Sequence, residues 1–249
     1  MGSIGRYASK LSKATKLLSR PVWRQALLKG VAATIEHRDL ARLITPKTVI
    51  DIGANKGQFT LFALQTWPGC RVFAFEPLPG PARTFRNVTG SHLNVSLYET
   101  AVGPSSGPAE MHLSRREDSS SLLPISAEME RAYPEARTSG STQTVKVTRL
   151  DAVLSQAELK GPTLVKLDVQ GFELEALRSF GKLLGAIDYI YVECSYIELY
   201  SGQPLITDIE QFLSSSGYVR QAELNRTQDS LAQNLQSDCL FTRTERMAA

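Results

Sequence analysis

Apolar residues along this chain form short runs that alternate with segments of helical periodicity. The runs at 49–52, 72–75, 95–102, 163–167 and 189–192 have the length of strands buried on both faces. Apolar positions recur at helical spacing at 59–64, 78–88, from about 172 onwards, and at 204–216. Strands that alternate with helices predict an α/β fold whose mostly parallel sheet is covered by helices on both faces.

Two parts of the chain depart from this alternation. Between residues 103 and 148, a possible extra strand at 107–113 is followed by a polar, serine-rich loop at 115–122, where a substrate lid could lie, and by a strand at 144–150. Near the end, segments 218–223 and 239–242 can form an antiparallel pair. The sequence therefore predicts a parallel sheet with an insertion and an antiparallel edge.

The first strand runs into a glycine turn, V-I-D-I-G-A-N-K-G at 49–57, which places Asp51 near the carboxyl end of the strand. Gly53 and Gly57 allow a sharp turn and close approach to a ligand. Glu76 follows Asp51 by 25 residues and ends the next strand, where a carboxylate can bind both ribose hydroxyls. The turn is neither G-x-G-x-x-G nor a Walker motif, which favours S-adenosylmethionine over a dinucleotide. The alternative is a purely structural turn with an incidental acid.

Length and composition fit one large α/β domain. The chain has 249 residues, 42% of them hydrophobic, and no apolar run long enough to cross a bilayer. Its three cysteines are widely separated, which indicates buried thiols in a reducing compartment. We therefore expect a cytoplasmic protein.

Positive charge is concentrated at the amino terminus. Residues 1–35 contain seven basic residues and no acidic one, which leaves 21 basic and 25 acidic residues elsewhere. The mildly acidic remainder argues against nucleic acid as a partner. Apolar residues at helical spacing in this arm suit either packing on the core, which we favour, or an amphipathic helix in peripheral contact with an anionic membrane. We therefore divide the chain into a basic helical arm at 1–44 and a cofactor-binding domain at 45–249.

Several blocks of the chain resemble the FkbM family of S-adenosylmethionine-dependent methyltransferases. They are V-I-D-I-G-A-N-K-G, F-E-P, T-R-L-D, L-V-K-L-D-V-Q-G-F-E-L-E-A-L and D-C-L-F-T-R, and the resemblance covers about residues 45–243. It implies a class I methyltransferase fold, Rossmann-like with seven strands, and commonly O-methylation of a sugar or polyketide hydroxyl. It also implies that Glu76 binds the ribose, and that the amino-acid part of the cofactor is held by Asp51, Gly53, Asn55 and Gly57.

The sequence offers two candidates for the contact with adenine. Either Glu99 or Thr100, at the end of the following strand, can approach the ring. Glu99 can equally be a solvated strand residue.

Methyl transfer to an alcohol requires alignment of the oxygen and removal of its proton, so a carboxylate or histidine should lie nearby. Asp168 follows the strand at 163–167 and is our first candidate; Glu173, five residues later, can instead cap a helix start. Glu193 also follows a strand, although an ion pair with Lys166 is an alternative for it. His112 is a candidate base that is otherwise structural. No metal-ligand spacing is evident, so we predict no metal site and leave metal dependence open.

Taken together, these patterns predict an S-adenosylmethionine-dependent O-methyltransferase. Its acceptor would be a small molecule or glycan, with the hydroxyl on a sugar of a glycan, glycolipid or secondary-metabolite precursor. The alternatives are a noncatalytic nucleoside-binding or membrane-docking module, or an N-methyltransferase acting on nucleic acid or protein.

Overall fold

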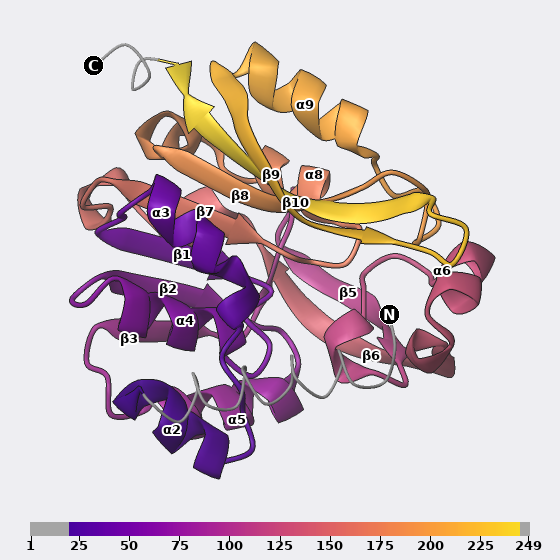
Figure 1. Ribbon diagram of the computed structural model, residues 1–249, viewed down its shortest axis with the longest axis horizontal. Coiled ribbons are helices and arrows are strands. Elements are labelled where there is room, and N and C mark those ends of the chain that lie inside the picture. Colours follow the sequence, from indigo (N-terminus) through magenta and orange to yellow (C-terminus); the bar gives the residue numbers. More distant parts are fainter. Residues whose placement is uncertain (1–19, 245–249) are drawn as a thin grey trace.

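A computed structural model describes residues 20–244 of the chain, and its centre is one twisted seven-stranded sheet (Figure 1). The five strands from β3 to β8 run parallel, whereas β10 pairs antiparallel with both β8 and β9. This arrangement confirms the predicted mostly parallel sheet with an antiparallel edge. In spatial order the strands are β3 (Val95–Tyr98), β2 (Arg71–Phe75), β1 (Thr48–Ile52), β7 (Thr163–Leu167), β8 (Tyr189–Ser195), β10 (Asn234–Arg243) and β9 (Tyr218–Gln228).

Helices cover both faces of the sheet, because side chains that alternate along each central strand point to opposite sides. On one face, Val49 and Leu164 pack with helices α3 (Leu40–Leu43), α4 (Gln58–Thr66) and α5 (Pro79–Thr89). On the other, Ile50 and Val165 pack with α7 (Leu150–Val153), α8 (Glu173–Arg178) and α9 (Ile206–Ser215). The fully buried central strands therefore contribute side chains to two apolar cores, one on each face of the sheet.

The insertion forms a second, three-stranded sheet beside the main one (Figure 1). Its order is β4 (Ala101–Val102), β6 (Thr138–Thr148) and β5 (Gly107–Ser114). The short 3-10 turn η2 (Glu117–Ser119) and helix α6 (Ala127–Ala132) connect β5 to β6.

The predicted strand at 95–102 is wrong as one element. The chain turns at Glu99 and Thr100, and the Thr100 hydroxyl donates to the carbonyl of Lys146, 3.0 Å away, in the second sheet. Residues 101–102 therefore leave the main sheet and join the insertion as β4. The helix expected from residue 172 is also shorter than its apolar pattern suggests, because a 3-10 turn follows its six residues.

The described part of the basic arm packs on the domain. Helix α2 (Pro21–Leu28) starts at Pro21, a position where proline is well tolerated, and lies against α4. The Trp23 indole donates to the Leu61 carbonyl at 2.9 Å, and Ala26 is buried with Leu61 and Val88. Residues 1–19, which carry most of the predicted membrane-contacting segment, lie outside the described residues. Within residues 20–244, no helix combines the length and apolar character needed to span a bilayer.

Candidate active site

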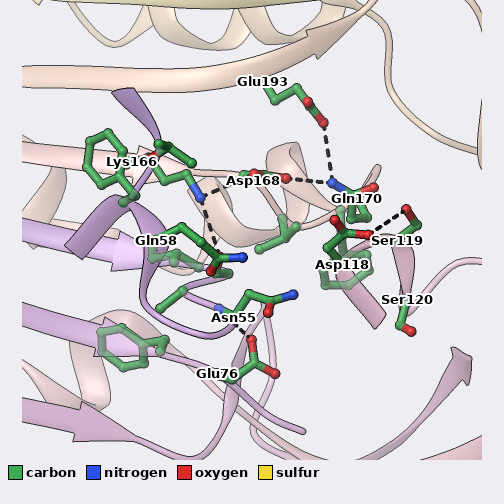
Figure 2. Close-up of a pocket in the computed structure, with 18 of the residues that line it drawn as sticks. Asn55, Gln58, Glu76, Asp118, Ser119, Ser120, Lys166, Asp168, Gln170 and Glu193 are labelled. Atoms are coloured by element: carbon green, nitrogen blue, oxygen red, sulfur yellow. Dashed lines mark hydrogen bonds and ion pairs between the residues drawn. The ribbon is translucent and has the colours of Figure 1, made fainter. Parts of the chain in front are cut away.

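A cavity of about 500 Å³ opens where the parallel strands end. It is lined by the turn after β1, the ends of β2, β7 and β8, the insertion, strand β10 and the segment before α3. Figure 2 shows how polar side chains from the turn after β1, the insertion and the ends of β2, β7 and β8 converge there. Ligands of open α/β sheets bind at this edge.

The turn after β1 shapes one wall of the cavity. Gly53 has φ +80°, and a Cβ placed there would lie 1.9 Å from the Asp168 carbonyl oxygen, so only glycine fits. Asn55 is also left-handed, with φ +46°. Gly53 and Asn55 line the cavity, whereas Gly57 is not among its described lining residues. Gly57, with φ +91°, instead starts helix α4 against the ring of Phe85.

Glu76 lies at the end of β2, and its carboxylate is 5% exposed. One oxygen accepts the Asn55 amide at 2.9 Å and the other accepts the Leu78 amide at 2.8 Å (Figure 2). Burial raises the pKa of Glu76 to about 7, although both amides favour the charged form. Each oxygen keeps a second lone-pair direction, so the carboxylate can still accept hydroxyl groups of a ribose.

Beyond Glu76 the cavity becomes apolar and suits a flat ring. Leu78, Ala101, Val102, Leu122 and Phe172 line this part, together with Thr100.

Glu99, one of the two candidates for the adenine contact, is not among the described lining residues of the cavity, whereas Thr100 is. Its partly exposed carboxylate forms an ion pair with Arg86. The physical reason is the turn after β3, which directs Thr100 rather than Glu99 towards the cavity.

A row of ion pairs, from Asp51 through Lys166 to Asp168, reaches the cavity. Asp51, predicted to hold the amino-acid part of the cofactor, is fully buried and is not among the described lining residues of the cavity. It accepts the Thr60 hydroxyl at 2.7 Å and lies 3.7 Å from Lys166 Nζ. Lys166 Nζ also lies 3.3 Å from Asp168, which does line the cavity. Asp51 therefore acts on the cavity through Lys166, and Lys166 pairs with Asp51 and Asp168 rather than with Glu193, the partner considered as an alternative.

Gln170 connects two candidate catalytic carboxylates. Its amide nitrogen lies 2.6 Å from Asp168 and 3.5 Å from Glu193 (Figure 2). Its amide oxygen accepts the Tyr200 hydroxyl at 2.7 Å, and Glu193 accepts the Gln236 amide at 2.7 Å. Burial and nearby acids raise the pKa of Glu193 well above its usual range. Asp168 and Glu193 thus face the same space.

The other two catalytic candidates, Glu173 and His112, are not among the described lining residues of the cavity. Glu173 is buried and folds back on its own loop, where it accepts the amides of Val169 at 2.9 Å and Gly171 at 3.2 Å. Side chains alternate along β5, so Met111 lines the cavity while His112 is not among the described lining residues. Glu173 therefore has the helix-start role that was the alternative for it.

The sequence reasoning missed a second polar cluster in the wall. It comprises His37, from the 3-10 turn η1 (Ile35–Asp39), Tyr191 of β8, Asn225 of β9 and Asp238 of β10. A signal existed in Asp238, an acid that precedes the apolar run C-L-F of the last strand. The meeting of four such distant segments is visible only in the fold.

The serine-rich loop at 115–122 forms the wall opposite the cofactor turn, where a lid was expected (Figure 2). Arg116 there bonds Asp118 at 2.8 Å and Glu135 at 3.3 Å. The Ser121 hydroxyl donates to the Gln170 carbonyl at 2.6 Å, which ties the loop to the β7–α8 turn.

These residues fit S-adenosylmethionine. Glu76 offers hydroxyl acceptors at a strand end, an apolar slot lies beside it, and the Gly53 turn brings backbone close to the cavity. Within residues 20–244, no cluster of three or more His, Cys, Asp or Glu side chains is arranged to hold a metal ion.

Comparison with known proteins identifies methyltransferases that are similar to this chain. The family model for the methyltransferase FkbM domain matches residues 51–220. The chain is 28% identical over 218 residues to the 2-O-methyltransferase NoeI of Sinorhizobium fredii, covering 84% of this chain and 89% of that protein. It is 26% identical over 224 residues to the hexuronic acid methyltransferase AglP of Haloferax volcanii, covering 87% and 82%. A solved structure of M. capricolum TrmK with S-adenosylhomocysteine aligns with a TM-score of 0.48 and 10% identity, over 83% of this chain and 66% of that one.

Proposed function

This chain belongs to the FkbM family of S-adenosylmethionine-dependent methyltransferases, and we propose that it methylates a hydroxyl group of a neutral sugar. Family membership favours an enzyme over the noncatalytic nucleoside-binding module. The names of two relatives, a 2-O-methyltransferase and a hexuronic acid methyltransferase, support oxygen on a sugar as the methyl acceptor.

The observation that carries the proposal is the polar half of the cavity. Beyond the residues that suit the cofactor, it is lined by the carboxylates of Glu193 and Asp238, the amides of Gln236 and Asn225, and the Thr227 hydroxyl. Carboxylates accept and amides both donate and accept, so such a set can bind adjacent sugar hydroxyls.

The charges of the cavity favour a neutral sugar over a sugar acid. Among the described residues, the arginine and lysine side chains that line it are Arg116 and Lys166. Arg116 pairs with Asp118 and Glu135, and Lys166 pairs with Asp51 and Asp168. A carboxylate-bearing acceptor would therefore face Glu193 and Asp238 without a cation to pair with.

Bound S-adenosylmethionine would supply a methyl group activated by its sulfonium. We assign Glu76 to hold the ribose, Asn55 to hold the amino-acid part of the cofactor, and Asp168 with Glu193 to orient the acceptor hydroxyls. Lys166 fixes Asp168 by an ion pair, and Gln170 contacts both Asp168 and Glu193 and so holds the two side chains near each other. Positioning of this kind accounts for much of the rate enhancement in a displacement reaction.

The test is methyl transfer to a panel of p-nitrophenyl glycosides of neutral hexoses, 6-deoxyhexoses, pentoses and uronic acids. We expect S-adenosylhomocysteine to form, and the mass spectrum to show one added methyl group, with neutral glycosides in preference to uronic acids. The Glu76→Ala protein provides the background. Preferred transfer to the uronic acids, or to amines and non-sugar alcohols in place of glycosides, would overturn the proposal.

A further inference from the structure

His37 borders the polar half of the cavity although it comes from a segment far from the other site residues in sequence. Its side chain is 12% exposed. The ring packs edge-on against Phe59 at 5.2 Å and Tyr191 at 5.5 Å between centroids. His37 is therefore fixed by packing at the edge of the acceptor space.

Hydrogen bonds around His37 determine which ring nitrogen carries the hydrogen. The Tyr191 hydroxyl donates to Asp238 at 2.9 Å, since a carboxylate is the stronger acceptor available to it. The amide nitrogen of Asn225 has two hydrogens and three neighbours: Asp238 at 2.8 Å, the Tyr191 oxygen at 3.2 Å and His37 Nδ1 at 3.3 Å. The two oxygen atoms are the nearer partners and take the two hydrogens.

With the Asn225 hydrogens directed to the two oxygen atoms, Nδ1 of His37 has two acceptors in reach. It lies 2.9 Å from the Tyr191 oxygen and 3.5 Å from the Asp238 carboxylate. Nδ1 must donate in this arrangement, so in the neutral ring Nε2 carries the lone pair. Between residues 20 and 244, no side chain or backbone group donates a hydrogen bond to Nε2.

We propose that Nε2 of His37 is the general base that removes the proton from the acceptor hydroxyl, an inference that rests on the proposed function. The acceptor oxygen forms its bond to the methyl carbon as the bond from that carbon to sulfur breaks. The bonding pair stays on sulfur, and the hydroxyl proton passes to Nε2. Asp238 is then a positioning residue, because it holds the ring and stabilises the imidazolium.

The charges near His37 are consistent with this role. Asp238, Glu36 and Asp168 favour the imidazolium, and Lys166 opposes it. Burial is the largest influence and lowers the pKa of His37, so the ring is neutral and able to accept a proton at neutral pH.

The kinetic test compares the wild type with His37→Gln, using S-adenosylmethionine and the glycoside that the panel identifies as the best acceptor. We expect kcat to fall about 10²- to 10⁴-fold, the usual contribution of a general base. Affinity for S-adenosylmethionine, measured by calorimetry, should stay within a few-fold. The acidic limb of the kcat profile against pH should also disappear. His112→Gln is the matched control, and we expect it to behave as wild type.

A second test needs no acceptor and separates this inference from the proposed function. Nitrogen-15 NMR of the full chain saturated with S-adenosylhomocysteine reports the tautomer of each of the three histidines, and the His37→Gln spectrum identifies the signals of His37. We expect hydrogen on Nδ1 and a bare Nε2. A hydrogen on Nε2, or a His37→Gln enzyme whose kcat is within a few-fold of wild type, would overturn the role of His37 even if the sugar is methylated. Failure of every glycoside with the expected tautomer would instead count against the proposed acceptor.

Discussion

At the residue scale, Glu76 combines two opposing influences. Burial disfavours its charge, while two backbone amides favour it, and the resulting pKa is about 7. The carboxyl is therefore close to half ionised at neutral pH before a ligand binds.

Cofactor binding should depend on the ionisation of Glu76. Ribose hydroxyls donate hydrogen bonds, so they favour the carboxylate, and protonation replaces an acceptor with a donor. We expect the Kd for S-adenosylmethionine to rise as pH falls below about 7, by up to about tenfold per pH unit. Calorimetric titrations at pH 6, 7 and 8 test this. Glu76→Gln should bind weakly with a flat profile, and an unchanged pH dependence in that variant would refute the assignment.

Asp168 should matter for the acceptor rather than for the cofactor. Asp168→Asn keeps the side-chain shape but removes the charge that Lys166 and Gln170 hold in place. Loss of a charged hydrogen bond costs about 1.5–3 kcal/mol, so kcat/KM for the glycoside should fall about 10- to 100-fold. The Kd for S-adenosylmethionine should change only a few-fold. The reverse pattern, weak cofactor binding with normal turnover, would contradict this division of roles.

At the element scale, the β7–α8 turn carries one acid that lines the cavity and one that is buried within the turn. Asp168 faces the cavity, whereas Glu173 is buried and holds two amides of the same turn. Burial raises the pKa of Glu173 to about 7.

The raised pKa of Glu173 determines how the free energy of unfolding changes with pH. Above a pH of about 4.5, Glu173 ionises in the unfolded chain but stays protonated in the folded protein. The free energy of unfolding therefore falls with rising pH until the pH passes the folded-state pKa of Glu173, which is about 7. A shift of that size corresponds to about 3 kcal/mol. Glu173→Gln keeps an oxygen for both amides and does not ionise, so its stability relative to wild type should increase between pH 5 and pH 8 in urea unfolding. Glu175→Gln, on the same helix but partly exposed, should show no such trend, and an equal trend in both would refute the explanation.

The individual elements also show which parts of the fold and site sequence patterns can predict. The run at 163–167 predicts β7 correctly, because a strand buried on both faces must be apolar throughout. The Asp51 and Glu76 motif correctly indicates the edge where the cavity lies. Patterns fail at 95–102 because periodicity does not reveal which sheet a strand joins. They do not show which face of β5 carries His112, because that depends on the orientation of the whole insertion.

At the scale of the whole molecule, the site is completed by segments distant in sequence. Thr34 and His37 line the cavity and follow α2, which Trp23 attaches to α4. The sequence predicts that part of the basic arm packs on the core, and residues 20–44 do so. No local pattern could place His37 beside Asp238, because their contact depends on the path of the complete chain.

The attachment of α2 can be measured. Trp23→Ala removes apolar contact and the hydrogen bond to the Leu61 carbonyl, and should lower the free energy of unfolding by about 3 kcal/mol. Trp23→Phe keeps most of the ring and should lose only about 1 kcal/mol. Urea unfolding followed by circular dichroism distinguishes the two. Equal, negligible effects would show that α2 contributes nothing to the stability of the domain.

The insertion between β3 and β7 has a further consequence for how such an enzyme can diversify. The residues that we assign to the cofactor come mainly from the turns after β1 and β2, whereas much of the opposite wall comes from residues 107–133. The polar residues that we assign to the acceptor, among them Glu193 and Asp238, also lie outside the insertion. Apart from Leu122, this part of the insertion can therefore vary without changing either set of residues, and exchanging it between relatives should alter the shape of the cavity while the strand-end chemistry stays the same.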